Sequence, residues 1–160
     1  MNEVVNKLIE LNRSISTMES CTGGFIANNI TNIPGASDIF KFGAVTYSNE
    51  YKIKMGVDSN LINTYSVYSK EVANSMSKTI SNFTNSDYGI GVTGKLNKCD
   101  KNNMSGKDNV VYISIYDRKM NKFYNSIVTV LYDDRCKNKE MVLNRIIELL
   151  EEILWKYIIL

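Results

Sequence analysis

Short strand patterns alternate with helical patterns along most of this 160-residue chain, and this alternation limits the possible folds more than any other feature. Apolar residues at helical spacing predict helices over 3–12, from about 23, over 49–55 and over 69–84. Runs rich in β-branched and aromatic residues predict strands over 14–17, 40–47 and 88–93. Such alternation is typical of α/β proteins, in which helices cover a mostly parallel sheet.

The last third of the chain adds a hairpin and a long helix. Strands are expected over 109–116 and 122–132, and the short connection between them predicts an antiparallel pair. The helix expected over 137–157 has an apolar stripe wide enough for burial against both the sheet and a second subunit, so we expect a homodimer or higher oligomer. The fold class predicted is a three-layer α/β/α sandwich, with a mixed, mostly parallel sheet of about five strands, one of them antiparallel. Residues 1–160 are expected to form a single domain.

Burial can also be predicted for individual elements. The strand at 40–47 is expected to be fairly buried, and Phe83 belongs to the apolar face predicted for the helix that Ser69 caps. Residues 94–108 are polar and rich in lysine and asparagine, which predicts a mobile loop.

Composition excludes several classes of function. The formal net charge is +2 and the basic residues are scattered, which argues against nucleic acid or a membrane surface as partner. No apolar stretch approaches the length of a membrane span. Three cysteines without metal-ligand spacing suit a reducing compartment, so a cytoplasmic location is expected.

The chain contains no histidine. This absence excludes Ser-His-Asp and Cys-His catalysis and most zinc sites. If the protein is a hydrolase, its general base must be Lys, Asp, Glu or Tyr, and no metal is expected.

Polar residues follow each of the first three predicted strands. Because the carboxyl ends of parallel strands meet at one edge of a sheet, these residues are expected to converge on a binding crevice. They are Ser20-Cys21-Thr22, Tyr47-Ser48-Asn49 and Thr93-Gly94. The alternative is that the serine and threonine only cap a helix, while Gly23 and Gly24 make a turn.

Lys52 follows Tyr47 by five residues and can point into the same crevice. A partly desolvated lysine has a lowered pKa and could take a proton from Ser20, directly or through the Tyr47 hydroxyl. The alternative is a solvated helix lysine. Cys21 is a rival nucleophile, but without an imidazole to activate it we expect a small packing residue.

Several motifs together resemble the C-terminal domain of the CinA competence/damage-inducible family. The resemblance covers essentially the whole chain. It rests on Glu19-Ser20-Cys21-Thr22-Gly23-Gly24, Pro34-Gly35-Ala36-Ser37, Val45-Thr46-Tyr47-Ser48-Asn49-Glu50 with Lys52 and Gly56-Val57, Ser69-x-Glu71-Val72-Ala73-x-x-Met76, and Asp134-Arg135.

The resemblance implies an amidase that hydrolyses nicotinamide mononucleotide to nicotinate mononucleotide and ammonia, without metal or cofactor, in pyridine-nucleotide salvage. It places a catalytic set on Ser20, Tyr47 and Lys52. Backbone N–H groups near 21–24 would hold the oxyanion or the phosphate. The implied substrate-binding residues are Cys21, Thr22, Gly23, Gly24, Ser48, Asn49, Thr93, Gly94, Arg135 and Lys139.

Two departures from the family pattern bear on this implication. After Gly94 the usual proline and most glycines are missing from the loop that should wall the nucleotide pocket. The second family arginine is Lys139, which keeps the charge but loses the bidentate fork. A catalytically inactive domain that binds a nucleotide or a protein is therefore the alternative function. A structural partner in DNA uptake or repair is a third, which the near-neutral charge does not support.

Overall fold

The computed structural model describes residues 1–156 and contains five strands within them. The strands are β1 (Ile15–Glu19), β2 (Phe40–Val45), β3 (Tyr88–Gly94), β4 (Val110–Asp117) and β5 (Lys122–Thr129). The helices are α1 (Asn2–Glu10), α2 (Phe25–Thr31), the 3-10 turn η1 (Ala36–Asp38), α3 (Asn49–Lys54), α4 (Ser59–Tyr65), α5 (Lys70–Thr84) and α6 (Arg135–Trp155).

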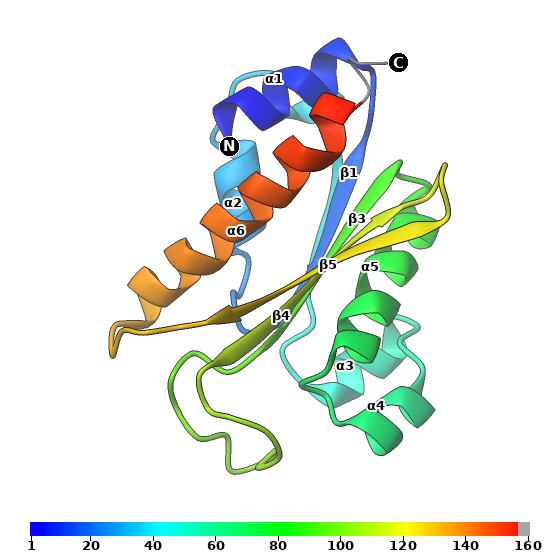
Figure 1. The fold of residues 1–160 in the computed structure, drawn as a ribbon. Helices are drawn as coiled ribbons and strands as arrows, with labels where there is room; N and C mark the ends of the chain where they lie inside the picture. Colours follow the sequence, from blue (N-terminus) through cyan, green and yellow to red (C-terminus); the bar gives the residue numbers. More distant parts are fainter. Residues whose placement is uncertain (157–160) are drawn as a thin grey trace.

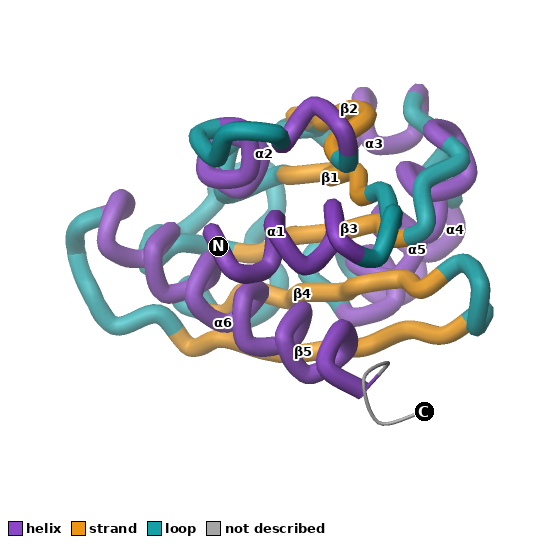
Figure 2. Tube along the Cα trace, turned by 90° about the horizontal axis from the view of Figure 1, so that it is seen from above, coloured by secondary structure: helices purple, strands orange, loops and turns teal. Residues whose placement is uncertain are grey.

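The strands form one sheet in the order β2-β1-β3-β4-β5, which Figure 2 shows from above. β1 pairs in parallel with both β2 and β3, whereas β4 pairs antiparallel with β3 and β5. β4 is therefore the single strand that runs against the others, as the sequence predicted. The carboxyl ends of β1, β2, β3 and β5 consequently lie at one edge of the sheet.

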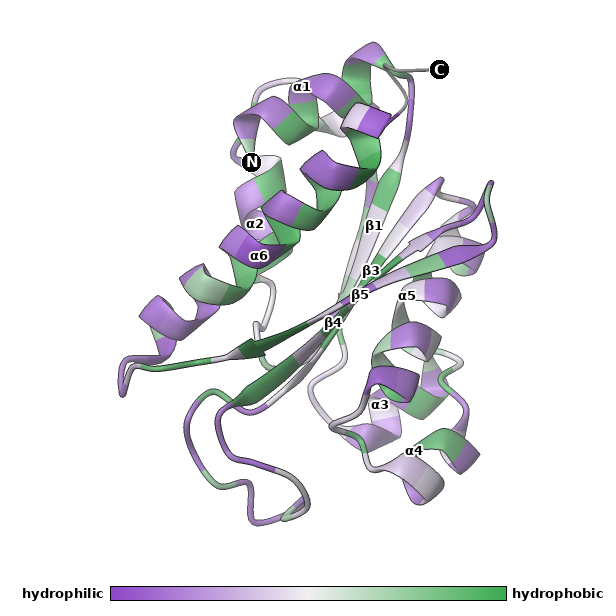
Figure 3. Ribbon diagram, viewed as in Figure 1, coloured by the Kyte–Doolittle hydropathy of each residue, from purple (hydrophilic) through white to green (hydrophobic). Residues whose placement is uncertain are grey.

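Helices cover both faces of the sheet, so the fold is the predicted three-layer α/β/α sandwich. α1, α2 and α6 lie on one face, and α3, α4 and α5 lie on the other (Figure 1). The larger apolar core lies under α1, α2 and α6, and a smaller one lies under α5, around Met18 and Met76. Figure 3 shows polar residues along the outward surfaces of α1 and α6.

α5 lies unusually close to the sheet because glycine and serine line their interface. A Cβ atom added to Gly89 would lie 2.0 Å from the carbonyl oxygen of Ser77, and one on Gly91 would lie 2.3 Å from that of Ala73. The hydroxyl groups of Ser77 and Ser114 also meet across this interface at 2.8 Å. These contacts fix α5 against β3 and β4.

Two expectations about burial were wrong. β2 is an edge strand and most of its residues are exposed, because nothing pairs with its outer side within the described residues. The Phe83 side chain is 65 % exposed and lies against the ring of Phe42 on that edge strand, with ring centroids 5.6 Å apart. The last turn of α5 thus packs at the margin of the sheet rather than over its centre.

The apolar stripe of α6 is buried, as expected, by the sheet and by α1 and α2 of the same chain. A second subunit is therefore not needed to cover it. The sequence predicted this helix through residue 157, and that last position lies outside the described residues. α4 was not predicted.

Candidate active site

A cleft of about 500 Å³ lies at the edge of the sheet where the parallel strands end. Seven of the residues singled out from the sequence line it, namely Ser20, Cys21, Tyr47, Ser48, Asn49, Gly94 and Arg135. Ser20 and Cys21 follow β1, and Tyr47 follows β2. Arg135 is the first residue of α6, which begins after β5 has ended at the same edge of the sheet. All three predicted clusters therefore reach one crevice, but Thr22 and Thr93 do not line it, nor do Gly23 and Gly24.

Ser20, which lines the cleft, is in direct contact with Lys52, which is buried behind it and does not line the cleft. The Lys52 Nζ atom lies 3.0 Å from Ser20 Oγ, and both side chains are buried. The same amine donates a hydrogen bond of 2.8 Å to the backbone carbonyl of Thr46. That second bond fixes the orientation of the amine towards the serine. Lys52 is therefore not a solvated helix lysine, although α3 as a whole is a short surface helix.

Burial lowers the pKa of Lys52 to about 8, and the nearby negative charge of Asp100 opposes this shift. An amine with such a pKa is deprotonated in a substantial fraction of molecules near neutral pH. A neutral amine at hydrogen-bond distance from a hydroxyl can accept its proton. Ser20 and Lys52 together therefore have the geometry of an activated nucleophile and its base.

Tyr47 is not part of that contact. Its side chain is 64 % exposed at the rim of the cleft, and its hydroxyl accepts a hydrogen bond of 3.4 Å from Arg135 Nη2. In the part of the chain that the structure describes, no hydrogen bond joins Tyr47 to Ser20 or Lys52. The direct contact of Ser20 with Lys52 makes a tyrosine relay unnecessary for activating the serine.

Glu19 is a residue that sequence reasoning missed. Its fully buried carboxylate accepts hydrogen bonds from the backbone N–H groups of Gly24 (3.1 Å), Ile26 (3.1 Å) and Ala27 (2.9 Å). It therefore caps α2 from the end of β1 and holds the turn that carries Ser20. The signal was a glutamate inside a strand of otherwise uncharged residues, directly before a turn with two glycines.

The turn between β1 and α2 leaves two backbone donors available. Within residues 1–156, no other residue accepts a hydrogen bond from the N–H groups of Cys21 and Thr22, whereas those of Gly23 and Gly24 are bonded to Ser20 and Glu19. Both glycines have positive φ, +59° and +93°, which a residue with a side chain rarely adopts. The two N–H groups of Cys21 and Thr22 directly follow Ser20 in the chain.

The Cys21 thiol packs in the core. Burial raises its pKa to about 12, so the sulfur stays protonated and is a poor nucleophile. Thr22 is also buried, and its hydroxyl has no hydrogen-bond partner among the described residues.

The remaining predicted residues divide between the cleft and its surroundings. Ser48 caps α3 through the N–H of Tyr51, and Asn49 donates to Asn103 across the cleft. The Thr93 hydroxyl is turned to the carbonyl of Val67 at 2.9 Å and does not line the cleft. Lys139 also lies outside the lining, with its Nζ atom 3.6 Å from where a Cβ of Gly23 would be.

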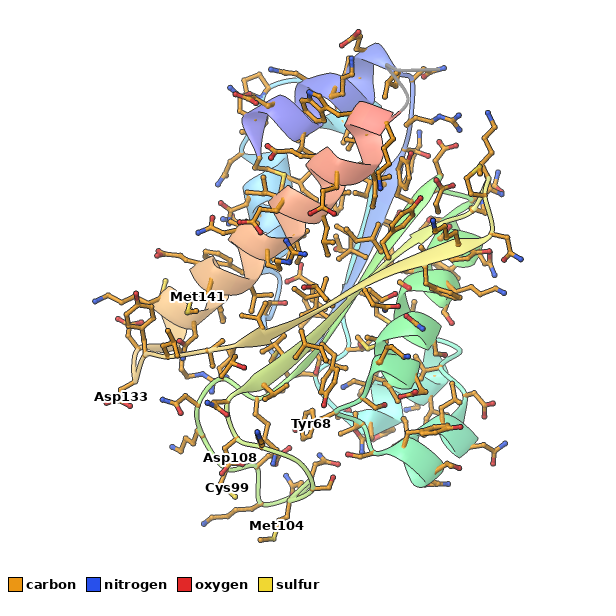
Figure 4. All side chains as sticks on the ribbon, in the orientation of Figure 1. Tyr68, Cys99, Met104, Asp108, Asp133 and Met141 are labelled. Carbon is orange, nitrogen blue, oxygen red and sulfur yellow. The ribbon has the colours of Figure 1, made fainter. Side chains whose placement is uncertain are left out.

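The outer wall of the cleft comes from Tyr68, which was not predicted, and from the 94–108 loop, which the family resemblance placed at the nucleotide pocket without naming its residues after Gly94. The loop contributes Lys95, Leu96, Lys98, Cys99, Asp100, Asn102 and Asn103. The Lys95 amine pairs with Asp108 at 3.0 Å and lies 5.2 Å from the centre of the Tyr68 ring. Figure 4 shows Tyr68, Cys99, Met104 and Asp108 at the same end of the molecule.

Among residues 1–156, no three acidic or cysteine side chains gather closely enough to hold a metal ion. Over the same residues, none of the helices combines the length and apolar character that crossing a membrane requires.

Comparisons with known proteins give a consistent result. A family model for the CinA C-terminal domain matches residues 1–154. A protein of Clostridium kluyveri named "Putative competence-damage inducible protein" is 41% identical over 120 residues, which cover 74% of this chain and 29% of that protein. One with the same name from Clostridium beijerinckii is 47% identical over 96 residues, covering 59% of this chain and 23% of that protein. The chain thus matches less than a third of the length of these curated relatives.

A solved structure shares the fold over nearly the whole chain. It is a competence-damaged protein (CinA) superfamily protein from Klebsiella pneumoniae, with a TM-score of 0.88 and 20% identity. The alignment covers 97% of this chain and 95% of that one. At this identity the likeness shows the fold alone.

Proposed function

Since this chain belongs to the CinA C-terminal domain family, we propose that it is an amidase that hydrolyses nicotinamide mononucleotide to nicotinate mononucleotide and ammonia. The observation that carries the proposal is the 3.0 Å contact of the buried Lys52 Nζ with Oγ of Ser20, which lines the cleft. A buried lysine aimed at a serine has no evident structural purpose, because burying an amine costs free energy that a surface position would avoid. Such burial is typical of a lysine that serves as a base.

The proposed reaction is acyl transfer through an ester on Ser20. Ser20 Oγ attacks the carboxamide carbon while Lys52 Nζ takes the hydroxyl proton. The carbon–nitrogen bond then breaks, the proton passes from Lys52 to the leaving ammonia, and the nicotinate group remains esterified to Ser20. Water then attacks the ester carbonyl while Lys52 accepts a proton from it, the bond between the carbonyl carbon and Ser20 Oγ breaks, and Lys52 returns the proton to Ser20 Oγ. The acid product leaves as its carboxylate and releases its own proton to solvent.

The backbone N–H groups of Cys21 and Thr22 are proposed to form the oxyanion hole. They are the donors of the β1–α2 turn from which no other residue within 1–156 accepts a hydrogen bond. Glu19 accepts hydrogen bonds from the N–H groups of Gly24, Ile26 and Ala27, which keeps the turn rigid. Donors fixed in advance stabilise a developing negative charge without the cost of reorganisation.

Arg135 and Tyr47 are proposed to contact the nucleotide rather than the reacting amide. Both line the cleft at its exposed rim, where they are joined by a hydrogen bond of 3.4 Å. An arginine at this position suits the phosphate of a mononucleotide, which a guanidinium binds through two parallel hydrogen bonds. Lys139 lies near Gly23 on the same side and adds a second positive charge.

The alternative is a domain that binds a nucleotide or a protein partner without turning it over. Its support is the exposed position of Tyr47, which makes no hydrogen bond to Ser20 or Lys52 in the described part of the chain. Thermal stabilisation by nicotinamide mononucleotide without release of ammonia would favour this alternative.

The test is an ammonia-release assay on nicotinamide mononucleotide with two matched lysine variants. Lys52→Met removes the buried amine, and we expect a loss of about a thousandfold or more in kcat. Lys54→Met is the control, because Lys54 lies on the same helix and is exposed, where it pairs with Glu50 and lies over the ring of Tyr51. Activity in wild type and Lys54→Met with none in Lys52→Met supports the proposal. Equal activity in all three proteins would rule out Lys52 as the base.

A further inference from the structure

The 94–108 loop is fastened over the cleft by hydrogen bonds that centre on one carboxylate. Asp100 accepts a hydrogen bond from the hydroxyl of Tyr68, a second from the Asn103 side chain at 3.0 Å, and a third from the backbone N–H of Asn102 at 2.9 Å. Both oxygens of Asp100 are therefore engaged. These bonds hold the segment that supplies the outer wall of the cleft.

The same carboxylate is connected to the helix that carries Lys52. The Asn103 side chain is held by Asp100 and accepts a hydrogen bond of 2.9 Å from Asn49, the first residue of α3. Asn49 and Lys52 are three residues apart on this helix and so lie on the same side of it. Asp100 is thus connected to Lys52 through two side-chain hydrogen bonds and one turn of α3.

Other contacts of the loop are peripheral by comparison. Lys95 and Asp108 pair at the base of the loop, where it leaves β3 and enters β4. Ser105 meets Ser66 outside the cleft at 2.6 Å, and the Asn97 side chain donates to the Tyr132 carbonyl at 3.0 Å and to Asp133 at 3.3 Å, on the side of α6. None of these contacts reaches α3, so among the contacts described Asp100 is the residue that links the tip of the loop both to Tyr68 and, through Asn103, to α3.

We propose that Asp100 is a positioning residue of this site: it closes the 94–108 loop over the cleft and fixes that loop to Tyr68 and, through Asn103, to the first turn of α3. Its carboxylate is engaged by protein donors, so it does not react with the substrate. Its effect on catalysis rests on the proposed amidase function. Its effect on the loop does not depend on that function.

The charge of Asp100 provides a second readout. Two acidic groups raise the pKa of the Lys52 amine and so oppose the effect of burial. They are Cys21 in the β1–α2 turn and Asp100 in the loop. Cys21 stays a neutral thiol because burial raises its pKa to about 12. Asp100 therefore supplies the negative charge, which stabilises the protonated amine. Removing that charge lowers the pKa of Lys52 and shifts the rise of the pH–rate profile to lower pH.

The experiment compares Asp100→Asn with Lys101→Gln in the full chain. Lys101 is the exposed neighbour in the same loop and makes no contact within the described residues, so its variant changes the net charge by one without loosening the loop. Hydrogen exchange of peptides from the 94–108 loop is followed with and without nicotinamide mononucleotide. For Asp100→Asn we expect exchange of the loop about tenfold faster or more, because two donors lose their acceptor.

Steady-state kinetics of the same variants distinguish a positioning role of Asp100 from a general loss of structure. Asp100→Asn is expected to raise KM about tenfold and to shift the pH–rate midpoint downwards. Asn103→Ala cuts the link to α3 but keeps the charge of Asp100, so it should raise KM and leave the midpoint unchanged. If Asp100→Asn does not fold, Asn103→Ala and Tyr68→Phe replace it in the exchange experiment, because each removes one of the donors to Asp100.

Two results would overturn the proposal: loop exchange in Asp100→Asn equal to that in wild type, or the same exchange increase in Lys101→Gln. Absence of ammonia release from the wild type would refute the amidase function alone. The exchange experiment would then still decide whether Asp100 fastens the loop.

Discussion

The two walls of the cleft are held in place by different means. On the inner wall, Ser20 and Lys52 are buried, Lys52 within α3 and Ser20 in the turn between β1 and α2, which the carboxylate of Glu19 holds. On the outer wall, the 94–108 loop has no regular structure and is tied by polar side chains such as Asp100, Asn103 and Asn49.

The difference has a physical consequence. When a buried polar group loses its partner, the uncompensated desolvation of that group lowers the stability by about 1–3 kcal/mol. An exposed side-chain hydrogen bond contributes about 1 kcal/mol or less to stability. Changes in the inner wall should therefore reduce kcat or the stability of the fold. Changes in the outer wall should act mainly on KM, because they alter how well the cleft closes on its ligand.

The largest effect is expected at the nucleophile. Ser20→Ala should lower kcat for ammonia release by about a thousandfold or more, while the folded structure and its thermal midpoint stay close to wild type. The measurement is steady-state kinetics together with thermal unfolding. Retained activity in a folded Ser20→Ala protein would show that Ser20 is not the nucleophile.

Glu19→Ala tests whether the inner wall depends on its buried cap. Three backbone N–H groups would lose a fully buried acceptor, and we expect a loss of about 3 kcal/mol in the free energy of unfolding. Denaturant unfolding measures the loss, and Glu3→Ala, on the exposed surface of α1, is the control. A change below about 0.5 kcal/mol, the range of an ordinary surface substitution, would show that Glu19 does not hold the turn.

The smallest effect is expected for Tyr47→Phe, which removes the hydroxyl that Arg135 contacts and keeps the ring. Because Lys52 reaches Ser20 directly, the rate should fall by less than about tenfold, and mostly through KM. Kinetics of ammonia release decide this. A thousandfold loss in kcat would show instead that Tyr47 relays the proton, as its position in the sequence first indicated.

The sequence predicted those parts of the site that depend only on where the strands end and on how they pair. Ser20 and Lys52 follow two strands that pair in parallel, so local patterns and the topology of the sheet were enough to bring them together. The single antiparallel strand followed in the same way from the short hairpin connection.

Other features depend on contacts that no local pattern encodes. Phe83 continues the apolar spacing of α5, but the sheet ends at β2, so its ring meets Phe42 at the margin and stays exposed. α4 has no buried residue and hence no apolar periodicity to reveal it. The 94–108 loop is composed of residues typical of solvated segments, and only its long-range partners, such as Tyr68 and Asn49, place it on the cleft.

The central claim is that Lys52 is the neutral base for Ser20, and the pH dependence of kcat/KM tests it most directly. Burial lowers the pKa of this lysine from 10.5 to about 8, so the amine is charged below that pH and cannot accept a proton. We expect kcat/KM to rise about tenfold per pH unit up to pH 8 and then to level off. A profile that keeps rising towards pH 10.5, or one that is flat between pH 6 and 9, would contradict the account.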